Sequence, residues 1–407
     1  MVGVLRNRTY RRLFGAQVVA LVGTGLLTVA LGLLAFGLAG RDAGAVLGTA
    51  LAIKMVAYVA VAPVVSALAE RAPRRVVLVG ADAIRAGVAV VLPFVGQVWQ
   101  VYVLIFALQA ASATFTPAFQ AVIPAIVADE TEYTAALSLS RLAYDMESLV
   151  SPVLAAGLLA VMSYHLLFVG TAMGFLASAG LVITTALPAV RVQRSVPLPQ
   201  RITRGARFMF ERPVLRGLLA MNLGVAAATA LVLVNTVVYV RDMLGGSPTD
   251  VALALGCFGG GSMIAALAIP RLVTFIADRT LMLTGAALLP LGLLAAAGPA
   301  GSNWGALTAT WILLGAGTSM INTLSARLLN AQSDPQIRPA VFAAQFSLSH
   351  ACFLLTYPIA GWVGAASGQL AAAITLAVLA TLAAATAAKA WPATTPSQRG
   401  AVPAQRR

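Results

Sequence analysis

Long apolar segments with almost no charged residues run through the whole chain, and they restrict its fold more than any other feature. Of the 407 residues, 60% are hydrophobic and only 10% are charged, whereas about a quarter of an average soluble chain is charged. A water-soluble globule of this composition would expose large apolar patches, which mark membrane contact or aggregation. The sequence therefore predicts an integral membrane protein.

The apolar segments have the length of membrane helices, which need about 20 largely apolar residues to cross the hydrocarbon core. Cutting the chain at clusters of Gly, Pro, Asn, Asp and Arg leaves twelve such segments: residues 13–39, 44–68, 76–96, 99–127, 134–162, 164–188, 214–240, 250–275, 280–299, 304–330, 338–366 and 368–391. We predict an all-α membrane protein with twelve transmembrane helices in two six-helix halves, residues 1–188 and 214–391.

The arginines give the chain an orientation. An arginine-rich linker, residues 189–213, joins the two halves, and residues 392–407 form a basic tail. If the N-terminus is cytoplasmic, the connections on that side hold most arginines, whereas the opposite connections hold only Arg41 and Arg241. Because arginine accumulates in cytoplasmic loops, we predict that both termini face the cytoplasm from an inner or plasma membrane. The net charge of +14 is then an orientation signal, and we expect no nucleic-acid partner.

The rarity of cysteine and histidine limits the chemistry. The two cysteines, Cys257 and Cys352, lie in apolar runs, and the two histidines, His165 and His350, are far apart in the sequence. The sequence contains neither HExxH nor GxxxxGK[ST]. It therefore predicts no disulfide framework, metalloprotease or P-loop ATPase. We expect no enzyme activity and no cofactor.

A few ionisable side chains lie near the middle of predicted spans: Lys54 in the second, Asp145 and Glu147 in the fifth and His350 in the eleventh. Charged groups at this depth are costly and usually face a cavity or a partner. Asp145 and Glu147 are about 200° apart on a helix, so only one of them can face a cavity. Arg141 lies one turn before Asp145 and favours an ion pair with it. Either carboxylate could carry a proton, with Asp145 the first choice, or both could form static pairs with Arg141 and Lys54.

Other polar side chains in the spans could contact a substrate. An imidazole binds nickel, cobalt or zinc, so His350 is a candidate metal ligand, although a lone histidine is also a common hydrogen-bonded core residue. Further candidates for the lining of a binding site are the amide side chains of Asn222, Asn235, Gln109 and Asn322. Two six-span halves of one orientation, joined by a basic linker, are typical of one large transporter class.

Residues 66–75 read Ser-Ala-Leu-Ala-Glu-Arg-Ala-Pro-Arg-Arg and resemble the G-x-L-A-D-R-x-G-R-R pattern between spans two and three of the major facilitator superfamily. Both glycines are replaced, and Glu stands for Asp. The resemblance implies a charge lock that forms a cytoplasmic gate, with these members: Glu70, Arg71, Arg75, Asp82 and Arg85. An ordinary basic loop is the alternative.

Other strings point to exporters within that superfamily. Residues 148–152, Ser-Leu-Val-Ser-Pro, resemble a Gly-Pro pattern in the fifth span of drug/proton antiporters. Four further stretches are similar to the nickel-resistance exporter branch, which merges into siderophore and drug exporters: residues 5–10, 52–58, 138–145 and 347–352. Some members of that branch carry a histidine-rich tail, which residues 392–407 lack. The resemblance implies that spans two, five, eight and eleven flank a central cavity.

These observations predict a secondary active transporter. We expect a proton-coupled exporter that works by alternating access as a monomer and carries a divalent transition metal or a metal chelate. The alternatives are efflux of drugs or other small hydrophobic molecules, and a membrane scaffold or sensor without transport. A drug site needs a mainly apolar and aromatic lining, whereas a metal site needs several converging ligands.

Overall fold

The computed structural model describes residues 2–57, 73–127, 130–185, 187, 198–334 and 337–391. In these residues the chain forms helices and the turns between them, without a β-strand. This confirms the predicted all-α fold. Eight apolar helical stretches of the described residues are long enough to cross a membrane, and Arg8–Val56 and Ala340–Ala390, with 49 and 51 residues, are each long enough to cross twice.

The helices of the N-terminal half are α1 (Arg8–Ala39), α2 (Ala43–Val56), α4 (Arg74–Val91), α5 (Val98–Ile126), α6 (Glu130–Leu159) and α7 (His165–Ile183). Those of the C-terminal half are α9 (Pro213–Val238), α10 (Pro248–Leu272), α11 (Asp278–Ala297), α12 (Trp304–Gln332), α13 (Arg338–Pro358) and α14 (Gly364–Ala390). Between them lies α8 (Leu198–Glu211), inside the segment predicted as a linker. Short turns of helix are η1 (Val2–Arg6), η2 (Gly40–Asp42), η4 (Leu92–Phe94) and η6 (Pro299–Gly301), and π-helical turns are η5 (Tyr239–Met243) and η7 (Ile359–Val363).

Local sequence signals start and stop these helices. The Asn7 side chain caps α1 by accepting hydrogen bonds from the backbone N–H groups of Thr9 and Tyr10. Ser247 and Asp250 form a capping box at the start of α10. Gly368, with φ of 86°, breaks the helix inside α14, because only glycine adopts this left-handed conformation without strain. The break falls where the sequence predicts a boundary between spans.

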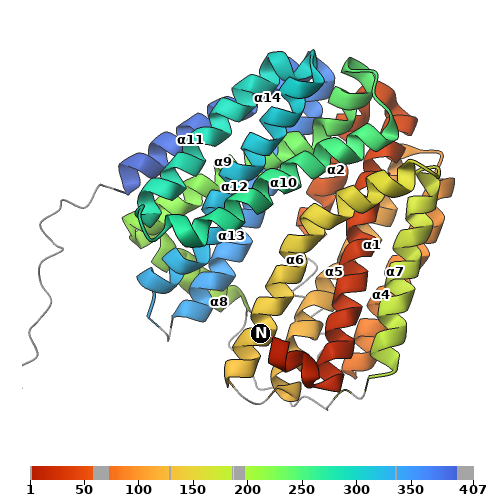
Figure 1. Ribbon diagram of the computed structural model, residues 1–407, viewed down its shortest axis with the longest axis vertical. Helices are drawn as coiled ribbons and strands as arrows, with labels where there is room; N and C mark the ends of the chain where they lie inside the picture. The colour runs from red at the N-terminus through yellow and green to blue at the C-terminus, as the bar shows by residue number, and fades with distance from the viewer. Residues whose placement is uncertain are drawn as a thin grey trace, which may run out of the picture.

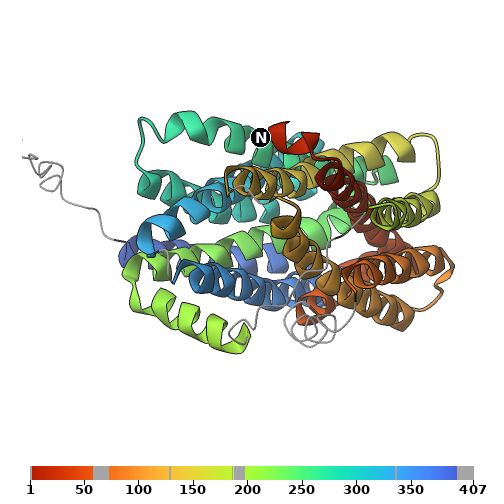
Figure 2. The same ribbon diagram turned by 90° about the horizontal axis from the view of Figure 1, so that it is seen from below.

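The two halves pack their helices in the same way. In the N-terminal half α1 packs against α7 and α6, and α4 packs against α5 and α7. In the C-terminal half α9 packs against α14 and α13, and α11 packs against α12 and α14. Figures 1 and 2 show the halves as two groups of helices side by side. Each half is therefore a bundle built on the same plan.

Contacts between the halves involve a small number of helices. α2 packs against α13, and α6 packs against α10. We call the end of the molecule that holds η2, η5 and η7 the outer end, and the end that holds η1 and α8 the inner end. The halves are in contact at the outer end and diverge toward the inner end (Figure 1). This arrangement places the last turns of α2 and the middle of α6 and α13 where the two bundles face each other.

Candidate functional site

Three helices bring ionisable side chains together at mid-depth. Lys54 comes from α2, Glu147 from α6 and His350 from α13. Lys54 lies within electrostatic range of both Glu147 and His350. All three side chains are half-buried, although they lie deep within the protein. This combination is typical of side chains that line an internal space, and it unites residues that are almost 300 positions apart.

The Glu147 carboxylate lies against α1. A Cβ atom built on Gly25 would be 3.0 Å from Glu147 Oε1 and would overlap the side chain of Ser151, one turn after Glu147. Ser151 is fully buried, and its hydroxyl has no hydrogen-bond partner among the described residues. Gly25 thus provides the space that Glu147 and Ser151 occupy. Pro152 follows directly and removes one backbone hydrogen bond of α6.

His350 belongs to a row of aromatic side chains on one face of α13. The row is formed by Phe346, His350, Phe353 and Tyr357, and the spacing of four, three and four residues places them on one side of the helix. Adjacent ring centroids lie 4.0, 6.3 and 5.3 Å apart. His350 Nδ1 lies 2.7 Å from the carbonyl oxygen of Phe346. The sequence analysis missed this aromatic row, although its helical spacing is visible in the sequence.

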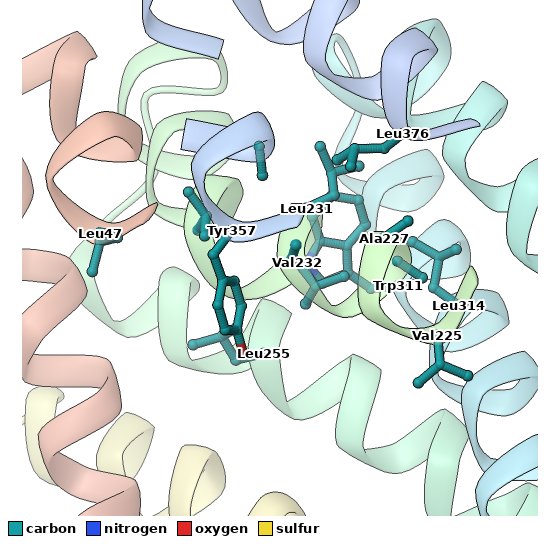
Figure 3. Close-up of a cluster of buried hydrophobic side chains, with 14 of the residues drawn as sticks. Leu47, Val225, Ala227, Leu231, Val232, Leu255, Trp311, Leu314, Tyr357 and Leu376 are labelled. Carbon is teal, nitrogen blue, oxygen red and sulfur yellow. The ribbon is translucent and has the colours of Figure 1, made fainter. Parts of the chain in front are cut away.

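The row continues into the packed core between the halves. In Figure 3 the Tyr357 ring points toward Leu255 of α10, and Leu47 of α2 lies on the same side of the cluster. Tyr357 and Leu47 are buried. The aromatic row therefore runs from the half-exposed Phe346 to the buried Tyr357, which packs in the hydrophobic core near the outer end.

The predicted amide ligands lie in different surroundings. Asn222 in α9 is buried, and its Nδ2 atom has no partner among the described residues. Asn235 is fully buried near the outer end, where its Nδ2 donates to the carbonyl oxygen of Ala360 at 3.0 Å. Gln109 is buried in α5, and Asn322 is exposed on α12. Asn235 thus joins two helices of the C-terminal half.

The backbone of Arg141 and Asp145 lies in α6, but their side chains lie outside the described part of the structure. The expected ion pair between them stays a prediction. Of the two carboxylates considered for proton coupling, Glu147 is the one whose surroundings the structure gives.

Glycines permit close contact between the halves at the outer end. A Cβ atom on Gly48 of α2 would lie 2.5 Å from the carbonyl oxygen of Tyr357 and 3.1 Å from the Cα atom of Gly361. A Cβ atom on Gly44 would lie 2.6 Å from Asn235 Oδ1, and one on Gly361 would overlap the carbonyl of Gly44. The backbones of α2 and η7 are therefore in direct contact, which only glycine allows.

Polar contacts strengthen the same surface. Trp362 Nε1 of η7 donates to Thr49 Oγ1 of α2 at 2.9 Å. Arg41 of η2 forms an ion pair with Asp242 of η5, with 3.1 Å between Nε and Oδ1. Arg241 lies over the ring of Phe36 in α1, 5.6 Å from its centroid. We call the surface formed by Gly44, Gly48, Thr49, Gly361, Trp362 and the Arg41–Asp242 pair the outer contact.

The sequence places this fold in a known family. The Major Facilitator Superfamily profile matches residues 13–245 and again residues 223–407. The chain belongs to the Major Facilitator Superfamily. It is therefore a multi-pass transport protein of the cell membrane rather than an enzyme, as the sequence predicts.

Two proteins that the chain resembles in sequence carry the name of an efflux protein. Macrolide efflux protein A from Streptococcus pyogenes is 26% identical over 276 residues, which cover 63% of this chain and 64% of that protein. The Enterococcus faecalis protein of the same name is 26% identical over 230 residues, which cover 52% of this chain and 67% of that protein. The chain thus matches just under two thirds of the length of the Streptococcus protein.

Solved structures share the superfamily fold over nearly the whole chain. A mutant of the nucleoside transporter NupG superposes with a TM-score of 0.75 and 14% identity, covering 94% of this chain and 100% of that chain. A bacterial homologue of the human lysosomal transporter Spinster superposes with a TM-score of 0.74 and 13% identity, covering 95% and 96%. These similarities confirm the predicted all-α fold.

The charge lock that the superfamily motif implies is only partly visible. Glu70 and Arg71 lie outside the described residues. Arg75 donates to the carbonyl oxygen of Thr185, after the end of α7, at 2.7 Å. This bond ties α4 to α7 within the N-terminal half.

Asp82 and Arg85 lie inside the N-terminal bundle. They are buried and form an ion pair with each other along α4. The Arg85 guanidinium lies between the rings of Phe115 and Phe175, 4.4 and 4.5 Å from their centroids. Such cation–π contacts stabilise a desolvated arginine. The pair therefore joins α4 to α5 and α7, away from the contact between the halves.

Proposed function

We propose that this chain is a proton-coupled exporter of small hydrophobic molecules that works by alternating access. Glu147 is the proton-carrying group in this proposal, and Lys54 is its counter-charge. The observation that supports it best is the meeting of Lys54, Glu147 and His350 between the two bundles. Both termini lie on the cytoplasmic side in this account.

The electrostatics of the site give a reason for coupling. A carboxylate at membrane depth is costly unless it is paired or protonated. Glu147 can therefore exist in a charged state, held by Lys54, or in a neutral state that holds a proton. Because Lys54 also lies within range of His350 on the opposite half, a change in the charge of Glu147 alters the attraction between the halves. If the cargo and the proton cannot bind at the Glu147 carboxylate at the same time, the protein exchanges outgoing cargo for an incoming proton.

The aromatic row on α13 favours a hydrophobic cargo. Phe346 is 53% exposed, and its ring is followed by His350 and Phe353 on the same helix face. Ligand sites for drug-like molecules are lined mainly by apolar and aromatic groups with a few polar ones. The similarity to macrolide efflux proteins supports the same cargo class.

A divalent metal or metal chelate, the first cargo expected from the sequence, has weaker support. A metal site needs several converging ligands. The described residues include no group of three or more His, Cys, Asp or Glu side chains that could hold a metal ion. His350 alone does not form such a site, so we do not propose a metal cargo.

The alternative of a scaffold without transport does not explain the charges. Lys54 and Glu147 destabilise a membrane bundle unless their pairing has a use. A scaffold would show no gradient-driven transport at all. A purely static pair would tolerate replacement of both residues by neutral ones of similar size without loss of transport, so experiment separates both alternatives from coupling.

The test uses purified protein in liposomes with an imposed pH gradient. A labelled macrolide and labelled nickel ions serve as the two probes, and Asp42→Asn, an exposed carboxylate at the outer end, is the matched control. We expect Glu147→Gln to abolish gradient-driven macrolide transport while allowing exchange without a gradient, and Asp42→Asn to behave like the wild type.

The double variant Lys54→Gln with Glu147→Gln distinguishes coupling from a static pair. We expect it to stay uncoupled from the gradient. Recovery of gradient-driven transport in the double variant would overturn the assignment of Glu147. Gradient-driven transport of nickel but not of the macrolide would overturn the cargo class.

A further inference from the structure

The linker between the two bundles contains a helix, α8, with two different faces. Its buried face consists of Gly205 and Met209, and its exposed face carries Arg204, Arg207 and Phe210. Figure 2 shows α8 at the edge of the C-terminal half beside α13. An amphipathic helix with arginines and an aromatic residue on its exposed side is typical of helices that lie in a membrane interface.

The buried face fixes α8 to the inner end of α13. A Cβ atom on Gly205 would overlap the carbonyl of Ala340 and would lie 2.9 Å from the Cβ atom of Ala344. Met209 is fully buried in the main core. α8 is therefore attached to the helix that carries His350, rather than being a free tether.

The exposed face is basic and partly apolar. The Arg207 side chain is 83% exposed, and its ion pair with Glu211 lies in water, where such pairs contribute little. Arg212 is exposed and stacks on the ring of Phe208, 4.2 Å from its centroid. Phe210 is 56% exposed between these arginines. A purely aqueous surface would not favour a large exposed aromatic residue at this position.

The connection to α9 sets the depth of α8 in the membrane. Arg212 immediately precedes α9, and the apolar run of that helix begins at Val214 and Leu215. The stretch Pro213–Met243 is a membrane span by length and composition. The C-terminal end of α8 therefore lies at the level where the hydrocarbon core begins, which is the level of the lipid headgroups.

We propose that α8 binds the phosphate groups of anionic phospholipids through Arg204, Arg207 and Arg212, with Phe210 placed among the upper acyl chains. Arginine pairs with phosphate through charge-assisted hydrogen bonds, and each basic residue near an anionic membrane adds to the attraction. Because α8 is attached to α13, the lipid composition of the membrane acts on the helix that lines the site.

The test measures the lipid preference of the full-length protein. Phosphatidylglycerol or phosphatidylcholine is titrated onto the purified protein, and bound lipids are counted by native mass spectrometry. We expect the wild type to prefer phosphatidylglycerol, and Arg204→Gln with Arg207→Gln to weaken this binding roughly 30-fold. The matched control is Arg8→Gln with Arg11→Gln, which removes two exposed arginines from the start of α1 at the same end.

Amide hydrogen exchange in lipid nanodiscs gives a second readout on α8 itself. Phosphatidylglycerol should slow exchange in residues 203–211 of the wild type and the control, but not in the α8 variant. Equal losses of lipid preference in the α8 and α1 variants, or no preference in the wild type, would overturn the proposal. Equal protection of α8 by inorganic phosphate would show a site for free phosphate rather than for lipid.

Discussion

Substitution of Gly48 by alanine should favour the conformation in which the outer contact is open. The new methyl group would lie 2.5 Å from the carbonyl oxygen of Tyr357 and 3.1 Å from the Cα atom of Gly361. Both neighbours are backbone atoms of the opposite half, so they cannot rotate away as a flexible side chain could. The closed conformation is therefore penalised, while an open conformation has no such overlap.

The size of the effect follows from the cost of overpacking. An extra carbon atom in a well-packed contact costs about 1–3 kcal/mol, which changes the ratio of closed to open molecules by roughly 5- to 150-fold. The higher helix propensity of alanine is gained in both conformations and cancels from this ratio. We expect G48A to lower transport, since a protein held open at one end cannot complete the cycle.

Spin-label distances across the outer end measure the shift. Val161→Cys and Ser302→Cys place labels on exposed turns of the two halves, in a background where Cys257 and Cys352 are replaced by serine. The label-to-label distance should increase in G48A and stay unchanged in Gly87→Ala, since nothing lies within 4 Å of the Cβ position of Gly87. An unchanged distance distribution with normal transport in G48A would refute the role given to the outer contact.

Three further substitutions test other parts of the structure. In Gly25→Ala the new methyl group should overlap Ser151 and contact Glu147, which lowers the free energy of unfolding by about 1–3 kcal/mol. A variant with wild-type stability and normal proton coupling would contradict this packing. Trp362→Phe removes the hydrogen bond to Thr49 and should destabilise the closed conformation of the outer end by about 1 kcal/mol relative to the open one. The same spin-label distances should show this shift. Arg41→Gln removes the ion pair with Asp242 and should change the label distances by less, because Arg41 is largely exposed. The difference between this variant and the wild type should disappear at high salt, which screens the pair.

Much of the fold could be predicted because membrane spans depend mainly on local composition. The predicted boundary between the last two spans falls at residue 367, and Gly368 breaks the helix there. The linker was predicted from its arginines, but the helix inside it was not. The amphipathic pattern of α8 is visible in the sequence, but its packing depends on a tertiary contact, between Gly205 and the backbone at Ala340, that the sequence does not reveal.

The candidate site could be predicted in part. Lys54, Glu147 and His350 are visible in the sequence because a charged or polar group in mid-span is rare. The outer contact is different, since the chain has 36 glycines and a glycine in a membrane helix gives no sign of which backbone it touches. A repeated signal was available: an Arg-Asp pair occurs at residues 41–42 and again at 241–242, and the structure joins the first member of one to the second member of the other.

Proton release on cargo binding tests the central proposal most directly. The purified wild-type protein is titrated with a macrolide in a weakly buffered solution that contains a pH indicator. If cargo and proton exclude one another at Glu147, binding should release a proton from the wild type and from Asp42→Asn, and none from Glu147→Gln. Equal release from Glu147→Gln and the wild type, or macrolide binding to the wild type without any release, would contradict the proposal.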